Sequence, residues 1–329
     1  MGGRRLKASP AARWVSCLAV WGLLVSVSSC SVSHAGGAPN PRVSSQHEAN
    51  TPATDVGGVP AASRVHGLFW RARGKLGSLY VLGSLPVVGS NFFPLDPRIE
   101  EAFARSTRLT VEVHVPEAEK ERAAERLVAA ARYSDPDTLK GHLSAGTWES
   151  LSAVLGSEQA RDALGGFRPW FIALNLELGQ LEYIGADADQ SLESHFLDRA
   201  VGKAVVALTT PEQQVRELQN LSDELAERRL QSVLENLPRM KRVLEEASGA
   251  WRERRAEVVA NALDGRLRAE FPDVFAELWL PRCRSFALSL LELSQQPGNT
   301  FAVVDVSLLV GKGGILEELA RRGLRVDQL

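Results

Sequence analysis

Short apolar strand patterns stand at both ends of the region 64–329, and a long run of helical patterns lies between them. Ser78–Gly83 near the start and Thr300–Leu309 near the end are rich in apolar and β-branched residues, as buried strands are. Residues 211–296 instead carry apolar residues at helical spacing, with both signs of charge interleaved. This pattern predicts an α/β fold, in which strands from both ends of the chain form a small central β-sheet and a large, mainly helical middle portion packs around it.

Pairing of the two end strands would bring the loop after Gly83 close to the loop after Val304. Side chains at the loop ends of such sheets commonly form sites in α/β folds. A hairpin is expected at Phe69–Gly83. The other predicted elements are strands at Arg108–Val115 and Ala204–Leu208, and helices at Pro97–Ser106, Glu117–Tyr133, Asp135–Ser144, Thr147–Leu155, Pro169–Leu178 and Ile315–Arg322.

The composition excludes two classes of protein. The formal net charge is −2, so nothing in the bulk charge favours binding to nucleic acid. Cys17 and Cys30 lie in the first thirty residues, which leaves Cys283 as the one cysteine of the region 64–329. A lone cysteine cannot close an intramolecular disulfide, so the hydrophobic core must supply the stability of this region.

The first 29 residues have the order of a bacterial secretory signal peptide. Four basic residues within residues 1–13 precede the apolar run Trp14–Val27, which is shorter than a membrane-spanning helix. The segment Val27-Ser28-Ser29-Cys30 resembles a lipobox, in which cleavage exposes the cysteine and its sulfur receives a diacylglycerol. We therefore expect a lipoprotein whose Cys30 carries lipid, with palmitate-type acyl chains that hold it on a membrane.

Residues 30–63 follow as the lipidated cysteine and a flexible tether. The stretch is rich in Ser, Ala, Gly, Pro and Thr and has almost no large apolar residues, so it cannot bury enough surface to offset its ordering entropy. The expected location is the cell envelope, facing away from the cytoplasm. Ser31 rather than an aspartate after the cysteine suits the outer membrane, if the organism has one.

The order of local motifs along residues 64–329 resembles the TraB/GumN family, whose relatives include Tiki-type metalloproteases. No single motif is specific, but their shared order makes chance a poor explanation. The matching segments are Tyr80-Val81-Leu82-Gly83, Thr110-Val111-Glu112, Arg168-Pro169-Trp170, Glu193-Ser194-His195-Phe196-Leu197, Leu208-Thr209-Thr210, Ala250-Trp251, Arg282 and Leu309-Val310-Gly311.

The departures from the family pattern fall on its presumed ligands. The family is thought to build a metal-dependent hydrolase site from two glycine-x-x-histidine motifs and glutamates. The resemblance places Pro86 and Leu308 where the two histidines would stand, and Thr209 where a glutamate would stand. The family positions that this chain retains are Gly83, Glu112, Glu193 and Arg282.

These replacements predict a pseudoenzyme without catalytic residues. A catalytic divalent metal needs about three protein ligands and an open water position. Proline and leucine offer no donor, so Glu112 and Glu193 would remain as a poor cage, and no resident cofactor is expected. Glu112 and Arg282 are expected to persist as a structural ion pair, because buried charges survive when they are paired.

One alternative keeps an enzyme. Glu112 and His114 lie two apart on a predicted strand and would share a face. If Asp305 reached them, with or without Glu193, these side chains would form a rebuilt site for a divalent metal ion. The simpler interpretation leaves His114 at a strand end without a catalytic role. Cys283 lacks a neighbouring histidine in sequence and is better explained as a buried helical cysteine than as a nucleophile.

Three functions fit these observations. The first is a non-catalytic envelope protein that binds a peptide or protein partner through the inherited cleft. The second is a divergent metal-dependent hydrolase or peptidase with substituted ligands. The third is a structural accessory that packs against another envelope component without using a cleft. An exposed apolar patch on the helices would favour the third over the first.

Overall fold

The computed structural model describes residues 65–86, 92–185 and 191–329 and shows a mixed α/β fold. Its six strands form one sheet in the order β4-β3-β5-β2-β1-β6. The pairs β2–β5, β5–β3 and β3–β4 are parallel, whereas β1 pairs antiparallel with β2 and β6. The strands are β1 Phe69–Arg73, β2 Ser78–Ser84, β3 Arg108–Val111, β4 Ala204–Ala207, β5 Thr300–Asp305 and β6 Val326–Gln328. The predicted sheet built from both ends of the chain is therefore confirmed.

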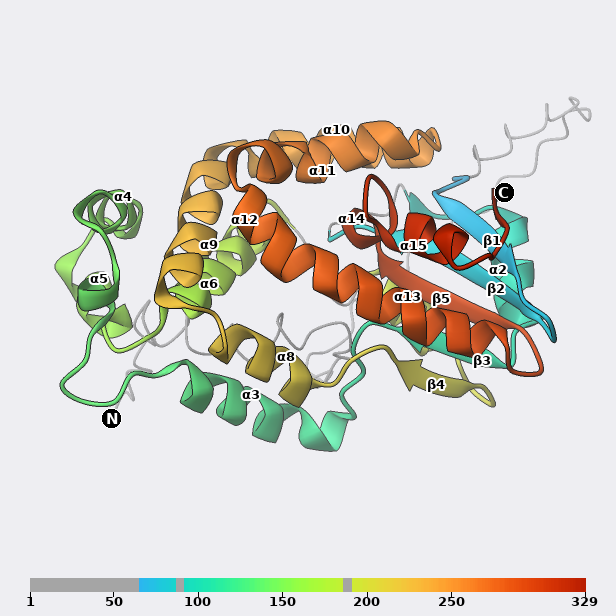
Figure 1. Cartoon of the computed structure of the whole chain (residues 1–329), viewed down its shortest axis with the longest axis horizontal. Coiled ribbons are helices and arrows are strands. Elements are labelled where there is room, and N and C mark those ends of the chain that lie inside the picture. Colours follow the sequence, from blue (N-terminus) through green and yellow to red (C-terminus); the bar gives the residue numbers. More distant parts are fainter. Residues whose placement is uncertain (1–64, 87–91, 186–190) are drawn as a thin grey trace, which may run out of the picture.

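The helical middle portion is also confirmed. In Figure 1, α13 and α15 cross in front of the sheet, and the helices α4, α5, α6 and α9 form the part of the molecule away from it. The helices are α2 Pro97–Ala104, α3 Glu117–Ala131, α4 Ala145–Leu155, α5 Glu158–Leu164, α6 Pro169–Tyr183, α7 Leu192–Leu197, α8 Pro211–Gln219, α9 Asp223–Asn236, α10 Met240–Arg252, α11 Ala256–Glu270, α12 Pro272–Val274, α13 Leu280–Ser294, α14 Val306–Leu309 and α15 Ile315–Arg321. Short 3₁₀ turns span Leu139–His142 and Leu237–Arg239, and the π-helical segment η5 spans Phe275–Trp279.

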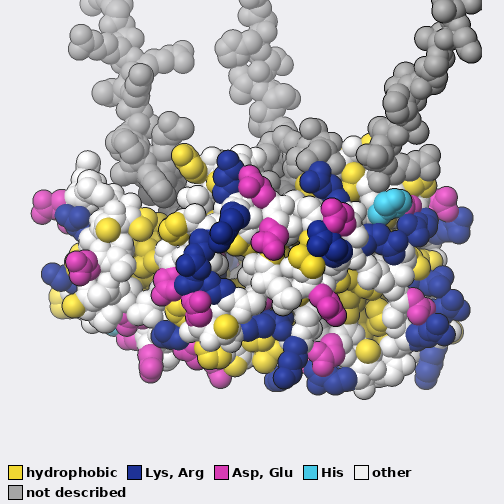
Figure 2. All heavy atoms as spheres, turned by 90° about the horizontal axis from the view of Figure 1, so that it is seen from above, with side chains coloured by type: hydrophobic (Ala, Val, Ile, Leu, Met, Phe, Trp, Pro, Cys, Tyr) yellow, Lys and Arg dark blue, Asp and Glu magenta, His cyan; other side chains and the backbone are white. Residues whose placement is uncertain are grey.

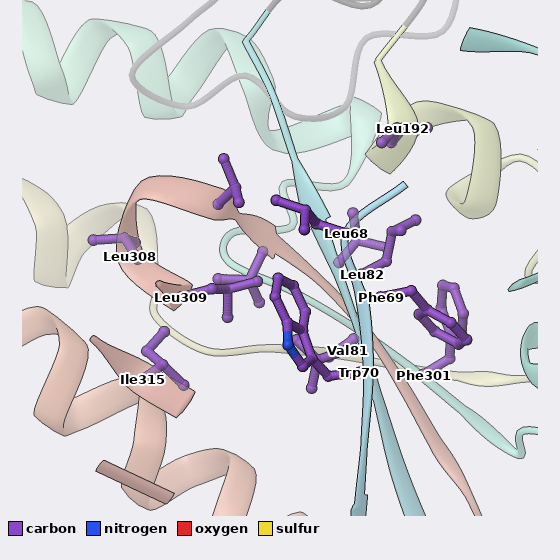
Figure 3. Close-up of a cluster of buried hydrophobic side chains, with 14 of the residues drawn as sticks. Leu68, Phe69, Trp70, Val81, Leu82, Leu192, Phe301, Leu308, Leu309 and Ile315 are labelled. Carbon is purple, nitrogen blue, oxygen red and sulfur yellow. The ribbon is translucent and has the colours of Figure 1, made fainter. Parts of the chain in front are cut away.

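The central strand β5 is covered on both faces of the sheet. Its first five residues are all buried, as expected for a parallel strand between two layers. Phe301 lies against Phe103 of α2 and Phe196 of α7. Figure 3 shows Phe69 and Phe301 on one side of the strands, with Leu309 of α14 on the other.

A second group of buried side chains holds the helical portion together. Leu127 of α3, Leu151 of α4, Phe171 of α6 and Leu230 of α9 belong to this cluster, which is separate from the cluster around the sheet. The molecule therefore has a sheet-centred core and a helical core, and the segments that run between them border both.

Two predicted strands are shorter than expected. The predicted strand at Thr300–Leu309 ends at Asp305, whose side chain accepts a hydrogen bond from the Ser307 N–H at 2.7 Å and begins α14. The predicted strand at Arg108–Val115 ends at Val111, which pairs with Val303 of β5.

The predicted helix at Asp135–Ser144 was wrong. Only the 3₁₀ turn Leu139–His142 forms there. Pro136 and Gly141 disfavour a helix, and the Asp137 carboxylate accepts a hydrogen bond from the Thr138 N–H at 2.9 Å. Local side-chain bonding therefore replaces the expected helical ladder.

The expected signal peptide, Cys30 and the tether lie outside the described residues. Within the described ranges, no helix has both the length and the apolar character needed to cross a membrane.

Candidate functional site

The carboxyl ends of the parallel strands meet at one edge of the sheet. Gly83 pairs with Val304 and Ser84 with Asp305, so the predicted proximity of these two loops is confirmed. Glu112 follows β3 directly at the same edge. Residues of family motifs that are far apart in the sequence therefore lie together at this edge of the sheet.

Gly83 fits this edge because α14 packs closely against it. A Cβ atom at Gly83 would lie 3.0 Å from a methyl carbon of Val306. The Gly83 carbonyl accepts a hydrogen bond from the Trp251 indole at 2.6 Å, which fixes the end of β2 against α10. The retained glycine thus has a packing reason that does not depend on catalysis.

Glu112 is held by two donors. One carboxylate oxygen accepts a hydrogen bond from the Asp305 N–H at 2.8 Å, and the other lies 3.4 Å from the Arg282 guanidinium. The predicted ion pair of Glu112 and Arg282 is confirmed. Burial raises the pKa of Glu112, the charge of Arg282 opposes this rise, and the nearby Asp305 carboxyl adds to it.

Glu193 and Asp305 add two more buried carboxyl groups. Glu193 of α7 is only 7% exposed, and burial raises its pKa to about 7 although the Ser84 hydroxyl hydrogen-bonds the carboxylate. The charges of Glu112 and Asp305 contribute to that rise. Burial likewise raises the pKa of Asp305, whose carboxylate caps α14. The edge therefore holds three carboxyl groups whose ionised forms are disfavoured.

Sequence reasoning missed a fourth buried carboxyl, Asp264 of α11. Burial raises its pKa to about 7, the charge of Asp305 adds to the rise, and Arg268 opposes it from 3.5 Å. Cys283 is buried nearby, and burial raises the pKa of its thiol to about 12. The thiol therefore stays protonated, in agreement with its interpretation as a buried helical cysteine.

The structure shows the surroundings of the three positions at which the resemblance predicts a replaced ligand. Pro86 lies in a half-buried bend just after β2. Thr209 is buried, and its hydroxyl donates a hydrogen bond to Gln213 at 3.2 Å at the start of α8. Leu308 of α14 is 5% exposed, and its carbonyl lies 3.5 Å from the Cys283 sulfur. None of the three side chains offers an imidazole or a carboxylate.

His114 does not join the carboxyl groups. Because β3 ends at Val111, the alternation that would place His114 on the face of Glu112 is lost. Burial lowers the pKa of His114, and so does the charge of Lys120 on α3. Across residues 65–86, 92–185 and 191–329, no group of three or more His, Cys, Asp or Glu side chains is arranged to hold a metal ion. The alternative site of Glu112, His114 and Asp305 is therefore not assembled in the structure.

A cavity of about 250 Å³, called here the inner cavity, opens at this edge. It extends from Glu112, Asp305 and Leu308 toward the helical core. Its wall includes Trp170 of α6 and Trp279 of η5. The Arg229 guanidinium lies 2.5 Å from Glu177 and 5.3 Å from the Trp279 ring centre, at the same cavity.

A second cavity of about 810 Å³, called here the outer cavity, adjoins the first. The two share Glu217, Leu278 and Arg282 as lining residues. The outer cavity lies between α8 and the start of α9 on one side and the run α12–η5–α13 on the other.

The shared wall is a π-helical turn that the sequence pattern did not predict. Pro281 has no N–H to donate to the carbonyl four residues earlier, and the widened turn just before it changes the ladder at that point. The Leu280 N–H donates to the Phe275 carbonyl, five residues back. This turn places Trp279 and Arg282 at the inner cavity. The sequence signal for this turn was Pro281, a proline inside an otherwise helical pattern. π-helical turns often occur at functional sites.

No curated protein and no solved structure matches this chain significantly. A family model described as the TraB/PrgY/gumN family matches residues 68–328, from β1 to the last strand. That match covers the sheet, both cores and both cavities, so this chain belongs to the TraB/PrgY/gumN family.

Proposed function

We propose that this chain is a lipid-anchored envelope protein whose TraB/PrgY/gumN domain binds a peptide or protein partner and does not catalyse hydrolysis. The observation that carries this proposal is the state of Glu112. Its carboxylate accepts from the Asp305 N–H and pairs with Arg282, so both oxygens already have partners within the protein. The Asp305 N–H and Arg282 therefore supply partners for this buried carboxylate without a metal ion.

The side chains around Glu112 lack the groups that hydrolysis needs. A metallohydrolase holds an ion through about three ligands and uses it to activate water. Pro86, Thr209 and Leu308 contribute no such ligand, and Leu308 places an apolar group on the cavity wall. The Cys283 thiol, which lies near Asp264, stays protonated and is a poor nucleophile.

The cavities support binding. Ligand sites are usually concave, mostly apolar and supplied with a few polar groups that fix orientation. The inner cavity combines leucine and tryptophan side chains with Arg282 and Asp305, and it opens onto the larger outer cavity. A pocket of this kind favours a partner that inserts a chain segment over a structural accessory that docks on a flat surface.

Metal content tests the catalytic part of the proposal. The full chain, purified in a non-ionic detergent and dialysed against trace zinc, manganese and cobalt, is expected to retain substoichiometric metal and to leave a mixed peptide library uncut. His114→Ala is the matched variant and should behave identically. One metal ion per wild-type chain that is lost in His114→Ala, or cleavage of the library, would establish the divergent hydrolase instead.

Membrane fractionation tests the anchor. We propose that lipid on Cys30 holds residues 64–329 at a membrane of the envelope, the outer membrane where there is one, through the tether 30–63. Cys30→Ala should move the protein from the membrane fraction to the soluble fraction or block its processing, whereas Cys17→Ala should change neither. Retention of the Cys30→Ala protein in the membrane would contradict lipid anchoring.

A further inference from the structure

The inner and outer cavities together form one groove, called here the acidic groove, in which acidic side chains outnumber basic ones. Arg229 and Arg282 are the only basic residues among the described residues that line it, and each is already paired with a glutamate. The acidic residues that line it are Glu112, Glu177, Glu217, Glu224, Asp273, Glu277 and Asp305. After the internal pairs are counted, a net negative charge remains along the groove.

Glu217 and Glu277 contribute most directly to this charge. Both side chains are exposed, they lie on α8 and η5 on opposite walls, and neither takes part in an ion pair within the described residues. Asp305 lies at the inner end, where its carboxylate accepts hydrogen bonds from the N–H and the side chain of Ser307. Asp273, by contrast, is paired with Arg228 at 3.0 Å.

The charges lining this groove differ from those on the face seen in Figure 2. On the face seen in Figure 2, which carries α10 and α11 at the top of Figure 1, acidic and basic side chains are interleaved and no large single-sign area forms. Interleaved charges are the ordinary solvated surface of helices. A concave site lined mainly by one sign of charge focuses the field and attracts ligands of the other sign.

A second, independent observation points to a ligand in the same groove. Trp170 is 3% exposed and lines the inner cavity, and its indole N–H has no hydrogen-bond partner in the described structure. The indole N–H of Trp279, on the same cavity, also lacks a partner. A buried donor without an acceptor has lost its hydrogen bonds to water and gained none in return, so such groups need an explanation. Carbonyl oxygens of a bound chain segment are suitable acceptors.

Aromatic rings next to carboxylates also suit a cation. The Arg229 guanidinium lies over the Trp279 ring at 5.3 Å, which shows that this ring already accepts a cation on one face. A ligand ammonium or guanidinium in the inner cavity would meet indole rings and the Asp305 carboxylate together. Cation–π and charge contacts of this kind strengthen when the groups are withdrawn from water.

From these features we infer that the acidic groove binds an extended peptide segment carrying lysine or arginine side chains. Its main-chain carbonyls accept hydrogen bonds from the indoles of Trp170 and Trp279, and its basic side chains lie against Asp305 at the inner end and against Glu217 and Glu277 at the outer end. This inference rests on the proposed function, because it names the chemical class of the partner that the cleft takes.

Calorimetric titration with defined peptides tests the inference. The full chain in a non-ionic detergent is titrated with a capped heptapeptide that contains two lysines, and with counterparts in which both lysines are replaced by glutamine or by glutamate. We expect the lysine peptide to bind about tenfold more tightly than the glutamine peptide and the glutamate peptide not to bind, with the preference weakening as salt rises. Tryptophan fluorescence should change on addition of the lysine peptide.

The variant Glu217→Gln with Glu277→Gln should remove the preference without harming the fold, because both side chains are exposed. Affinity for the lysine peptide should fall about tenfold, while the glutamine peptide should be unaffected. Glu149→Gln, an exposed carboxylate of α4 outside the groove, is the matched control and should change neither affinity.

The outcomes separate this inference from the proposed function. Equal binding of the lysine and glutamine peptides would overturn the inference and leave partner binding intact. Charge-selective binding followed by cleavage of the peptide would uphold the inference and overturn the non-catalytic function. Absence of binding by all three peptides would overturn the inference.

Discussion

In two clusters of charged side chains, the surroundings shift the pKa values of the carboxyl groups in opposite directions. At the sheet edge, burial raises the pKa values of Glu112, Glu193 and Asp305. In the helical portion, the exposed Asp137 has a lowered pKa because it hydrogen-bonds His142. The first cluster holds acids where their ionised form is disfavoured, and the second holds them where it is favoured.

The second cluster is closed by direct pairing. The two ring nitrogens of His142 lie 2.7 Å from the Asp137 carboxylate and 2.7 Å from the Asp223 carboxylate. The His142 ring also stacks on the Tyr133 ring, with 4.3 Å between the ring centres. The Arg168 guanidinium lies 4.9 Å from the centre of the Tyr133 ring. The cluster therefore joins the turn after α3 to the start of α9, and every charge in it has an opposite neighbour.

The two clusters contribute differently to the stability of the fold. Surface clusters with matched charges stabilise modestly, whereas buried carboxyl groups with few donors cost stability at neutral pH. Groups with strongly shifted pKa values gather at functional sites more often than elsewhere. The raised pKa values of the buried carboxyl groups therefore mark the sheet edge as the candidate functional site.

The largest effect is expected from removing Arg282, the cation paired with Glu112. Arg282→Ala leaves the Glu112 carboxylate buried without its cation and should destabilise the protein by roughly 2 to 3 kcal/mol at neutral pH, below the range for fully buried pairs because Arg282 is partly exposed. Chemical denaturation measures this change. The loss should shrink as pH falls and Glu112 becomes protonated, since a protonated Glu112 no longer needs the partner.

Two further variants show whether charge is the cause. Glu112→Gln in the Arg282→Ala background should recover most of the stability, because the buried charge is then gone. Arg126→Ala removes one partner of an exposed pair with Glu212 and should change stability by less than about 0.5 kcal/mol. If the double variant were no more stable than Arg282→Ala, lost packing of the arginine would explain the effect instead.

A gain in stability is expected from Glu193→Gln. A carboxyl whose folded pKa is raised binds its proton more tightly when folded, so its contribution is favourable at low pH and is lost as pH rises from about 4.5 to about 7. The amide cannot ionise and keeps the size of the carboxyl. The variant should therefore be more stable than the wild type at pH 8, by roughly 2 kcal/mol, and similar to it at pH 4.

Denaturation of both proteins across this pH range is the measurement. Glu182→Gln, at an exposed position on α6, should follow the wild type throughout. A Glu193→Gln protein that is less stable at pH 8 would mean that the Ser84 hydrogen bond to the carboxylate outweighs the cost of burying its charge.

The sequence predicted the sheet edge better than the cavities. Strand patterns at Ser78–Gly83 and Thr300–Leu309 predicted that the loops after Gly83 and Val304 lie close together, and Gly83 pairs with Val304. The resemblance to the family singled out Glu112 and Arg282, and the need to neutralise a buried carboxylate then predicted their pairing. Both therefore survive without knowledge of how the helices pack.

The residues that the sequence did not reveal are those placed by tertiary packing. Nothing in a linear pattern shows that Trp170 and Trp279 line one cavity. Asp264 lies within the charged helical segment 211–296, yet α11 buries it. The predicted strand Arg108–Val115 included His114, whereas β3 ends at Val111.

The smallest predicted effect concerns His142, for which we expect a pH dependence of stability opposite to that of the sheet edge. Burial opposes protonation of His142, but the hydrogen bonds to Asp137 and Asp223 outweigh it and raise the pKa of the ring. A raised histidine pKa gives stability that is fully present below the ordinary value of 6.5 and is lost as pH rises through the folded value. For Asp137, with its lowered pKa, the contribution is lost only at pH below its ordinary value of 3.8.

His142→Gln should therefore lower the melting temperature by a few degrees at pH 5.5 and by less at pH 9, the reverse of the pH dependence expected at the sheet edge. Asp223→Asn, which removes one of the two carboxylates, should give part of the same loss with the same pH dependence. A loss in His142→Gln that is equal at both pH values would assign the role of His142 to its stacking on Tyr133 rather than to its charge. In that case the contrast between the two clusters would be one of burial alone, because pairing would no longer distinguish them.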